Sequence, residues 1–149
     1  MFVNSDFSEL LSIFKRNSVK YLVIGGYAFI QYAEPRFTKD LDILIAANPE
    51  NAKVVYQSLL EFGAPLQDLN EADFAKEGYF YQMGSPPVRV DILMDIPGVN
   101  FAEAWERRLN VDFGDTAVSF ISKQDLIAAK RASGRPRDLL DIELLTDDD

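Results

Sequence analysis

The sequence predicts an α/β (α+β) fold in which helices flank a mixed β-sheet. Segments with apolar residues at helical spacing alternate with short, β-prone apolar runs, in the order helix, strand, helix, strand, helix, strand. The chain has 149 residues, of which 48% are hydrophobic and 26% charged, which suits one core-forming domain over residues 1–149. Helices that alternate with strands are expected to bury their apolar faces against the sheet.

The first elements follow from capping and periodicity. Asp6 and Glu9 have the spacing of a capping box, so a helix is expected to begin near Asp6. Its apolar face repeats at helical spacing through Phe7, Leu10, Leu11 and Phe14. Residues 21–24 form a short apolar run typical of a buried strand. A helix is expected over residues 27–33, because Pro35 disfavours helical backbone at the residue before it.

The middle of the chain contains a second strand and a third helix. Residues 40–45 read as a strand, and Pro49 suits the first turn of the helix that follows. That helix is expected to end at Gly63, a residue common at helix C-termini. Residues 66–78 are polar and acidic, and are interpreted as a connection.

The remaining elements are shorter. Two strands, a short helix, a hairpin and two helices are expected, with Ser122 as a helix cap, Gly134 closing that helix, and a frayed tail. The expected ranges are strands 79–83 and 88–94 around a turn at 84–87, helix 101–108, hairpin strands 111–113 and 117–121 flanking Gly114-Asp115, helices 123–132 and 136–145, and tail 147–149.

The composition excludes several kinds of chemistry. The chain contains no cysteine and no histidine, so disulfides, cysteine-based zinc sites and histidine bases are excluded. A formal net charge of −9 argues against a protein that coats nucleic acid. No secretory signal pattern begins the sequence and no apolar run approaches the roughly 20 residues of a membrane span, so a cytoplasmic protein without membrane contact is expected.

Three carboxylates are the main candidates for chemistry. Asp40 and Asp42 lie two residues apart in a strand, so their side chains share a face and their Cα atoms are about 6.5–7 Å apart. Asp91 lies in a second apolar strand and joins them if the two strands are neighbours. Such a set suits Mg²⁺ or Mn²⁺, in one- or two-metal phosphoryl chemistry. The alternative is that Asp40 is an entry or edge residue of its strand and that Asp42 and Asp91 lie on a solvated face.

Gly25-Gly26 lies between a strand and a helix. Glycine at this position lets backbone N–H groups approach a phosphate at a helix N-terminus. The alternative is a tight turn that needs glycine only for its geometry.

The order of these motifs resembles the nucleotidyltransferase superfamily. A strand, Gly25-Gly26, a helix, Arg36-x-Thr38-x-Asp40-Leu41-Asp42 and a later strand with Asp91 stand in the order found there. The resemblance implies a nucleotidyltransferase-type mixed sheet, metal ligands at Asp40, Asp42 and Asp91 that are also the catalytic residues, and an NTP such as ATP as substrate. It also implies nucleotide contacts from Gly25, Gly26, Arg36, Thr38 and Lys130.

A second motif resembles the AbiEii-like nucleotidyltransferases of abortive-infection and toxin–antitoxin systems. Asp125-Leu126-Ile127-Ala128-Ala129-Lys130 matches their Asp-apolar-apolar-x-x-Lys motif, and Asp138, or else Asp141, matches the acidic motif after it. The resemblance implies that Lys130 lies at the nucleotide phosphates and that an antitoxin or other partner protein exists. The chain departs from it in having Gly26 where many relatives have Ser, and in a short C-terminal part.

Several interpretations stay open. Arg36 can contact a phosphate or balance Asp40 and Asp42, and Lys130 can stabilise the end of its own helix instead. The acceptor hydroxyl can belong to a tRNA, a protein or a small molecule. The enzyme hypothesis competes with a non-catalytic nucleotide- or partner-binding module, and with a purely structural domain.

Overall fold

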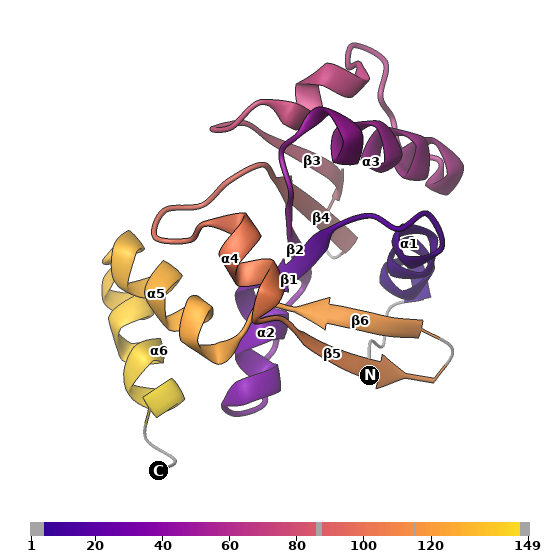
Figure 1. Ribbon diagram of the computed structural model, residues 1–149. Coiled ribbons are helices and arrows are strands. Elements are labelled where there is room, and N and C mark those ends of the chain that lie inside the picture. The colour runs from indigo at the N-terminus through magenta and orange to yellow at the C-terminus, as the bar shows by residue number, and fades with distance from the viewer. Residues whose placement is uncertain (1–4, 86–87, 115, 147–149) are drawn as a thin grey trace.

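The centre of the protein is a six-stranded mixed β-sheet (Figure 1). A computed structural model describes residues 5–85, 88–114 and 116–146. The strand order is β3-β4-β2-β1-β6-β5, with β2 parallel to β4 and β1 parallel to β6, while the other neighbours are antiparallel. The strands are β1 (Tyr21–Ile24), β2 (Asp40–Ile45), β3 (Phe80–Ser85), β4 (Val88–Leu93), β5 (Leu109–Phe113) and β6 (Thr116–Phe120).

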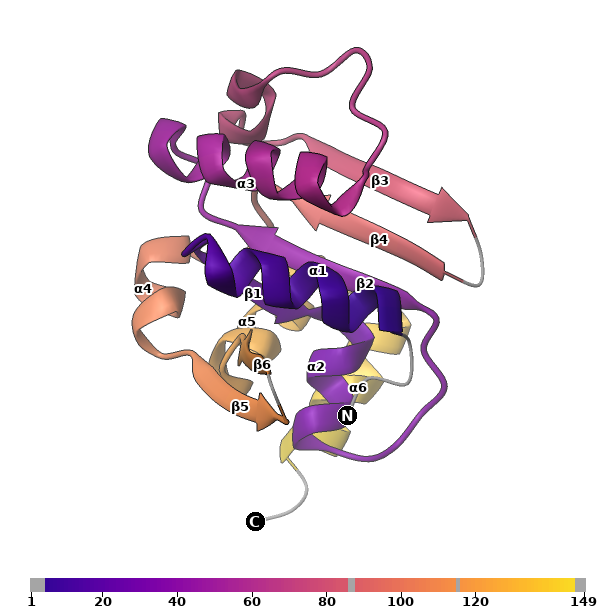
Figure 2. The same ribbon diagram turned by 90° about the vertical axis from the view of Figure 1, so that its right-hand side faces the viewer.

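Helices lie on both sides of this sheet. Figure 2 shows α1 and α3 in front of the strands and α5 and α6 behind them, while α2 follows β1 directly and contacts α5 and α6. The helices are α1 (Ser5–Arg16), α2 (Gly25–Tyr32), α3 (Pro49–Phe62), α4 (Phe101–Glu106), α5 (Lys123–Ser133) and α6 (Pro136–Thr146), with a 3₁₀ helix η1 (Glu71–Ala75). In the part of the chain described, no helix is both long and apolar enough to cross a membrane.

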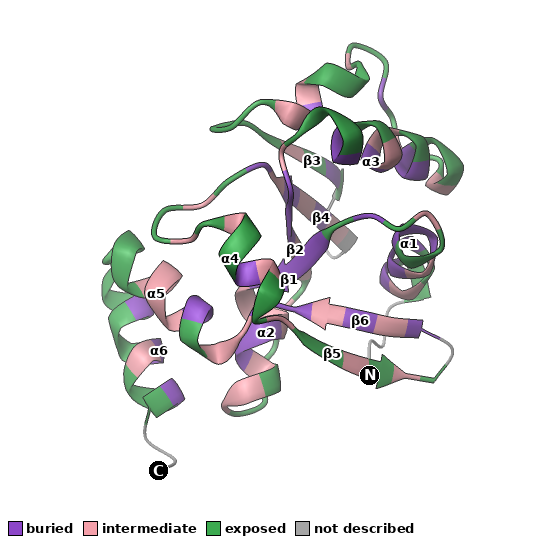
Figure 3. Ribbon diagram, in the orientation of Figure 1, coloured by how far each residue is buried: buried purple, intermediate pink, exposed green. Residues whose placement is uncertain are grey.

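A large part of the hydrophobic core lies between the sheet and the helices α1 and α3, and buried residues of α2, α5 and α6 extend it. On β2, Leu41, Ile43 and Ile45 are fully buried, as their alternation predicts, whereas Asp40 and Asp42 point to the other face. Figure 3 shows buried residues concentrated in the strands and on the inner sides of the helices. The alternation on β2 thus separates a packing face from a polar face, and the polar face is turned toward α5.

The predicted arrangement of helices around a mixed sheet is confirmed, and most elements match within a few residues. Three differences have physical reasons. Helix α2 begins at Gly25 without a loop, because Gly25 adopts φ +69°, which turns the chain from strand into helix. Residues 66–78 include η1, stabilised by a capping box between Asn70 and Asp73. Strand β3 extends to Ser85, into the expected turn, because Gly84 and Ser85 still pair with Arg89 and Val88 of β4.

Three of the expected segments are described only in part or not at all. Pro86 and Pro87 of the expected turn, Asp115 of the hairpin, and the tail 147–149 lie outside the described residues. Where other ends differ, they do so by one or two residues, since helix and strand ends depend on local hydrogen bonds that periodicity does not specify.

Candidate functional site

The strand pairing places the candidate carboxylates together. Strands β2 and β4 are parallel neighbours, and their register sets Asp42 opposite Asp91 and Asp40 opposite Arg89. Since side chains two residues apart share a face, all four point to the side of the sheet that α5 covers. The expectation that the strand of Asp91 lies beside the strand of Asp40 and Asp42 is therefore confirmed.

A cation that sequence reasoning missed lies among these carboxylates. Arg89 Nη2 is 3.0 Å from Asp40 Oδ2 and 3.5 Å from Asp91 Oδ2, and Arg89 Nε is 3.4 Å from Asp91 Oδ1. Its position could have been found from the sequence, because Arg89 precedes Asp91 by two residues and so shares its strand face. Arg89, not Arg36, balances Asp40.

Among the residues that the structure describes, Asp42 has no direct counter-ion of this kind. Burial raises its pKa to about 7, aided by the negative charges of Asp91 and Asp40 and by a hydrogen bond with Asp91, and only partly opposed by Arg89. Ionised Asp42 therefore has a free-energy cost, because its carboxylate is half-buried and faces two others. A bound cation removes such a cost.

The donor set fits a hard divalent cation, although the ligands are not preassembled. Asp91 Oδ1 is buried and finds no hydrogen-bond partner among the described residues, and it belongs to the carboxylate opposite Asp42. Oxygen ligands of this kind suit Mg²⁺ or Mn²⁺. Within residues 5–85, 88–114 and 116–146, however, no group of three or more acidic side chains is arranged so that it could hold a metal ion. Arg89 engages Asp40 and Asp91, so its side chain must move before all three converge.

The glycine turn packs directly against the polar strand face. A Cβ at Gly25 would collide with Oδ2 of Asp42, and a Cβ at Gly26 would lie 2.6 Å from Thr38 Oγ1. Gly25 directly follows Ile24, which pairs with Asp42 at the end of β1. Both glycines are thus required for close approach, and the N-terminus of α2 lies beside the carboxylates. Thr38 donates a weak hydrogen bond of 3.5 Å to the carbonyl oxygen of Asp40.

A pocket of about 390 Å³ opens in front of Asp42 and Asp91. Gly25 and Lys130 also line it, so four of the residues predicted from sequence share one cavity. An apolar part of its wall lies beside Asp42 and Asp91, whereas its wall on the α5–α6 side carries further charge. The apolar wall consists of Ile24, Phe80, Leu93, Ile96 and Pro97, and the charged wall includes Lys130, Arg135 and Asp138.

Lys130 is held in this pocket by two buried carboxylates of α6. Its Nζ lies 2.9 Å from Asp141 Oδ2 and 3.5 Å from Asp138 Oδ1, and its side chain is 12% exposed. Burial raises the pKa values of Asp138 and Asp141, but hydrogen bonds and nearby cations outweigh it and hold both below the ordinary value. Lys130 also lies in the last turn of α5, so stabilisation of that helix end stays a prediction beside its pairing with α6.

Arg36 is also engaged on this side. Its guanidinium donates two hydrogen bonds to Asp141, of 2.8 and 3.2 Å, and lies 3.7 Å from the ring centre of Phe29. The expectation that Arg36 balances Asp40 and Asp42 is corrected, because Asp141, from a helix 105 residues further along the chain, supplies its partner. Whether Arg36 contacts a phosphate stays a prediction.

Removal of the Lys130 charge is expected to destabilise the fold in a pH-dependent way. Lys130→Met leaves two buried carboxylates with one cation fewer, at an expected cost of about 1–3 kcal/mol at pH 7. Carboxylates with lowered pKa stabilise the fold above their unfolded pKa, and this stabilisation is lost as pH falls through the folded pKa. The deficit of the variant should therefore shrink below about pH 4.

Urea unfolding of Lys130→Met at several pH values measures this deficit. Lys76→Met is the matched control, since Lys76 pairs with Asp73 on the surface, where an ion pair contributes little. Equal stability of the Lys130 and Lys76 variants at pH 7 would contradict the assignment.

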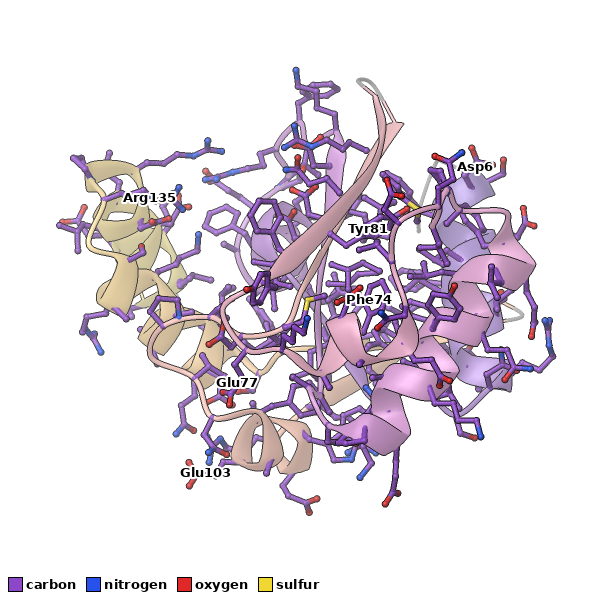
Figure 4. The ribbon with its side chains drawn as sticks, turned by 90° about the horizontal axis from the view of Figure 1, so that it is seen from above. Asp6, Phe74, Glu77, Tyr81, Glu103 and Arg135 are labelled. Carbon is purple, nitrogen blue, oxygen red and sulfur yellow. The ribbon has the colours of Figure 1, made fainter. Side chains whose placement is uncertain are left out.

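The aromatic residues near the site divide between the two faces of β3. Tyr81 packs against Phe74 at 5.8 Å and donates a hydrogen bond to the Pro65 carbonyl oxygen. Figure 4 shows Tyr81 beside Phe74, well away from Arg135. Tyr81 therefore serves packing beside Phe74 and does not face the pocket. Phe80 points to the site face instead and is 60% exposed in the pocket wall.

Comparison with solved structures identifies the class of fold. The lincosamide antibiotic adenylyltransferase LnuA, solved with lincomycin, matches with a TM-score of 0.59 at 16% identity, over 96% of both chains. ANT(2")-Ia, solved with adenylyl-2"-tobramycin, matches with a TM-score of 0.61 at 12% identity, over 95% of this chain and 86% of that one. An antigenic nucleotidyltransferase-like protein from Paracoccidioides brasiliensis matches with a TM-score of 0.54 at 15% identity, over 95% and 74%. The fold is that of the nucleotidyltransferases.

The sequence itself gives the family. Residues 3–146 match the model of a family described as "Nucleotidyltransferase of unknown function (DUF6036)", and the chain belongs to this family. No curated protein matches the sequence significantly. The predicted fold class and the prediction of a nucleotidyltransferase enzyme are confirmed.

Proposed function

We propose that the protein, acting as one domain, transfers a nucleotidyl group from an NTP to an acceptor hydroxyl in a reaction that requires Mg²⁺ or Mn²⁺. The observation that carries the proposal is the pairing of Asp42 with Asp91 in a pocket whose opposite wall holds Lys130. Oxygen ligands on one side and a buried cation on the other suit a metal-bound triphosphate.

Each residue has a role in this reaction. The N–H groups at Gly25 and Gly26 and the Lys130 ammonium bind the phosphates, and Asp40, Asp42 and Asp91 hold the divalent cation. A divalent cation held there would supply neutralisation of the phosphate charge. The acceptor oxygen forms a bond to the α-phosphorus while the bond from that phosphorus to the bridging oxygen breaks. Pyrophosphate leaves with the electron pair, and Asp91 accepts the hydroxyl proton.

A small molecule is the favoured acceptor. A pocket of about 390 Å³ lies within the range of small-molecule sites, which spans roughly 300–1,000 Å³. The formal net charge of −9 disfavours a large polyanion such as tRNA. The solved adenylyltransferases of this fold, with lincomycin and adenylyl-2"-tobramycin in their structures, also support a small acceptor. tRNA and protein hydroxyls stay as alternatives.

Calorimetric titration of ATP, CTP, GTP and UTP, each with and without Mg²⁺, tests the nucleotide site. Binding of at least one NTP is expected to require Mg²⁺ and to be lost in Asp42→Asn. If the wild-type protein binds none of the four in either condition, the proposed function is wrong.

Gly25→Ala is expected to disturb both stability and nucleotide binding. Alanine at φ +69° costs about 1–2 kcal/mol, and its Cβ would also displace the Asp42 carboxylate. Gly63→Ala is the matched control, because Gly63 has φ +91° but no described heavy atom lies within 4 Å of the added Cβ. Thermal melting should show strain in both variants, while calorimetry should show weakened Mg²⁺–NTP binding only in Gly25→Ala. Equal NTP affinities would argue against the role given to the glycine turn.

The AbiEii-like subtype and a toxin role form the finer part of the proposal. Contact between Lys130 and Asp138 supports it, since these residues match consecutive motifs of that subfamily. Three leucines of α6 are at least 38% exposed and offer a surface for an antitoxin in the cytoplasm: Leu139, Leu140 and Leu144. This surface also favours the alternative of a non-catalytic partner-binding module. Co-purification of a partner that Leu140→Lys abolishes would support partner binding, and NTP turnover by the isolated chain would exclude the non-catalytic alternative.

A further inference from the structure

Arg89 is a cation built into the carboxylate cluster. It lies opposite Asp40 in the register and two residues before Asp91, so its side chain enters the polar strand face with both. The side chains of Arg89, Asp40 and Asp91 are 34%, 30% and 14% exposed, so water screens these charges only in part. Three carboxylates and one guanidinium leave an excess of negative charge at the site.

The contacts of Arg89 are incomplete as an ion pair. Only the 3.0 Å contact to Asp40 has the length of a good hydrogen bond, whereas both contacts to Asp91 are 3.4–3.5 Å. Arg89 Nε and Asp91 Oδ1 are buried without a hydrogen-bond partner among the described residues. A committed structural arginine would instead satisfy its carboxylate in a paired geometry, as Arg107 does with Asp125 at 2.8 and 3.0 Å.

We propose that Arg89 is a positioning residue that serves as the internal counter-ion of the metal-free site and competes with the divalent cation for Asp40 and Asp91. This inference rests on the proposed function, since it assumes that the carboxylates bind a metal ion. A metal ion and a guanidinium cannot both lie between Asp40 and Asp91 without strong repulsion. Metal entry therefore requires Arg89 to leave these carboxylates.

The polyphosphate of the substrate offers a second partner for the released guanidinium. Arginine binds phosphate oxygens with several donors at once, so the transfer from carboxylate to phosphate keeps its charge paired. Arg89 consequently makes the site bind a metal ion weakly when no nucleotide is present.

Titration of Mn²⁺ into the nucleotide-free full chain, followed by electron paramagnetic resonance of free Mn²⁺, tests the competition. Arg89→Met is expected to bind Mn²⁺ at least about tenfold more tightly than wild type, because a competing charge is removed. Arg89→Lys should stay close to wild type. Arg16→Met is the matched control, since Arg16 pairs with Glu61 on the exposed surface, and its affinity should change less than about twofold.

Two further measurements keep the result unambiguous. Circular dichroism must show that Arg89→Met is folded. A damaged site would bind Mn²⁺ more weakly, so damage does not explain tighter binding. Addition of Asp42→Asn to Arg89→Met should abolish the gain. If wild type and Arg89→Met bind Mn²⁺ equally, or the variant binds it more weakly, the role of Arg89 is overturned and the metal site stands. If neither protein binds Mn²⁺, the metal-dependent function fails together with it.

Discussion

Asp42→Asn is expected to reduce nucleotidyl transfer by about a thousandfold or more while the fold is kept. Asparagine has nearly the shape of aspartate but no charge, so the strand, the register with Asp91 and the contact with Gly25 can all persist. Loss of a single preorganised electrostatic contact to the reacting groups lowers turnover by about 10²–10³-fold, and Asp42 would act on the cation that neutralises the triphosphate. Its effect should lie at or above the upper end of that range.

Pyrophosphate release measures this loss. The assay uses the NTP that wild type binds most tightly and a small-molecule extract as the acceptor pool. Asp68→Asn, which neutralises an exposed carboxylate in the loop after α3, serves as the control and should keep wild-type turnover. Turnover by Asp42→Asn within about tenfold of wild type would reject the assignment of Asp42 as a metal ligand, because a lost ligand lowers turnover far more.

The elements that sequence reasoning located best are those with local signals at both ends. Helix α3 runs from Pro49 to Phe62, as expected from a proline that suits the first turn and from Gly63 at its end. The side chain of Asn48 also caps it, by accepting a hydrogen bond from the N–H of Asn51. Strand β2 has the expected bounds because its apolar and acidic residues alternate.

The order of strands in the sheet could not be derived in this way. Periodicity shows which side chains share a strand face, but it does not show which strands are neighbours. Strands β2 and β4 are about fifty residues apart along the chain and pair in parallel, so no hairpin turn between them predicts the pairing. From the sequence, only the resemblance to a known superfamily predicted that Asp91 lies beside Asp42.

The contacts of the cations were the weakest part of the prediction. Arg36 is close to Asp40 along the chain, yet it pairs with Asp141, because the segment before β2 passes close to α6. Arg89 is far from Asp40 along the chain and pairs with it through the sheet register. Ion pairs depend on tertiary distance, and single-sequence reasoning favours neighbours in sequence.

The cost of keeping Asp42 charged should be visible as a pH-dependent stability of the metal-free protein. Burial first, and then the charges of Asp91 and Asp40, raise the pKa of Asp42 from 3.8 to about 7. The folded state therefore binds more protons than the unfolded state between about pH 4 and pH 7. Stability contributed by Asp42 falls as pH rises through this window, and it stays reduced above pH 7.

Asp42→Asn is consequently expected to be more stable than wild type at pH 8 in the presence of a chelator. Raising a carboxyl pKa from 3.8 to about 7 corresponds to at most about 4 kcal/mol, so a gain of about 2–4 kcal/mol is expected after the site relaxes. The gain should vanish near pH 4, where both proteins have a neutral group at this position. Because the two proteins differ only here, other titrating groups, such as Asp138 and Asp141, largely cancel in the difference.

Urea unfolding of both proteins from pH 4.5 to 8, with and without Mg²⁺, measures this difference. In the chelated protein the advantage of Asp42→Asn should grow with pH, whereas Mg²⁺ should reduce it by stabilising wild type alone. Asp68→Asn should show no such trend, since its carboxylate is exposed in both states. An advantage that is independent of pH would mean that asparagine improves packing, not charge. If Asp42→Asn gains stability and loses turnover, the charge of Asp42 is needed for the reaction although it destabilises the fold.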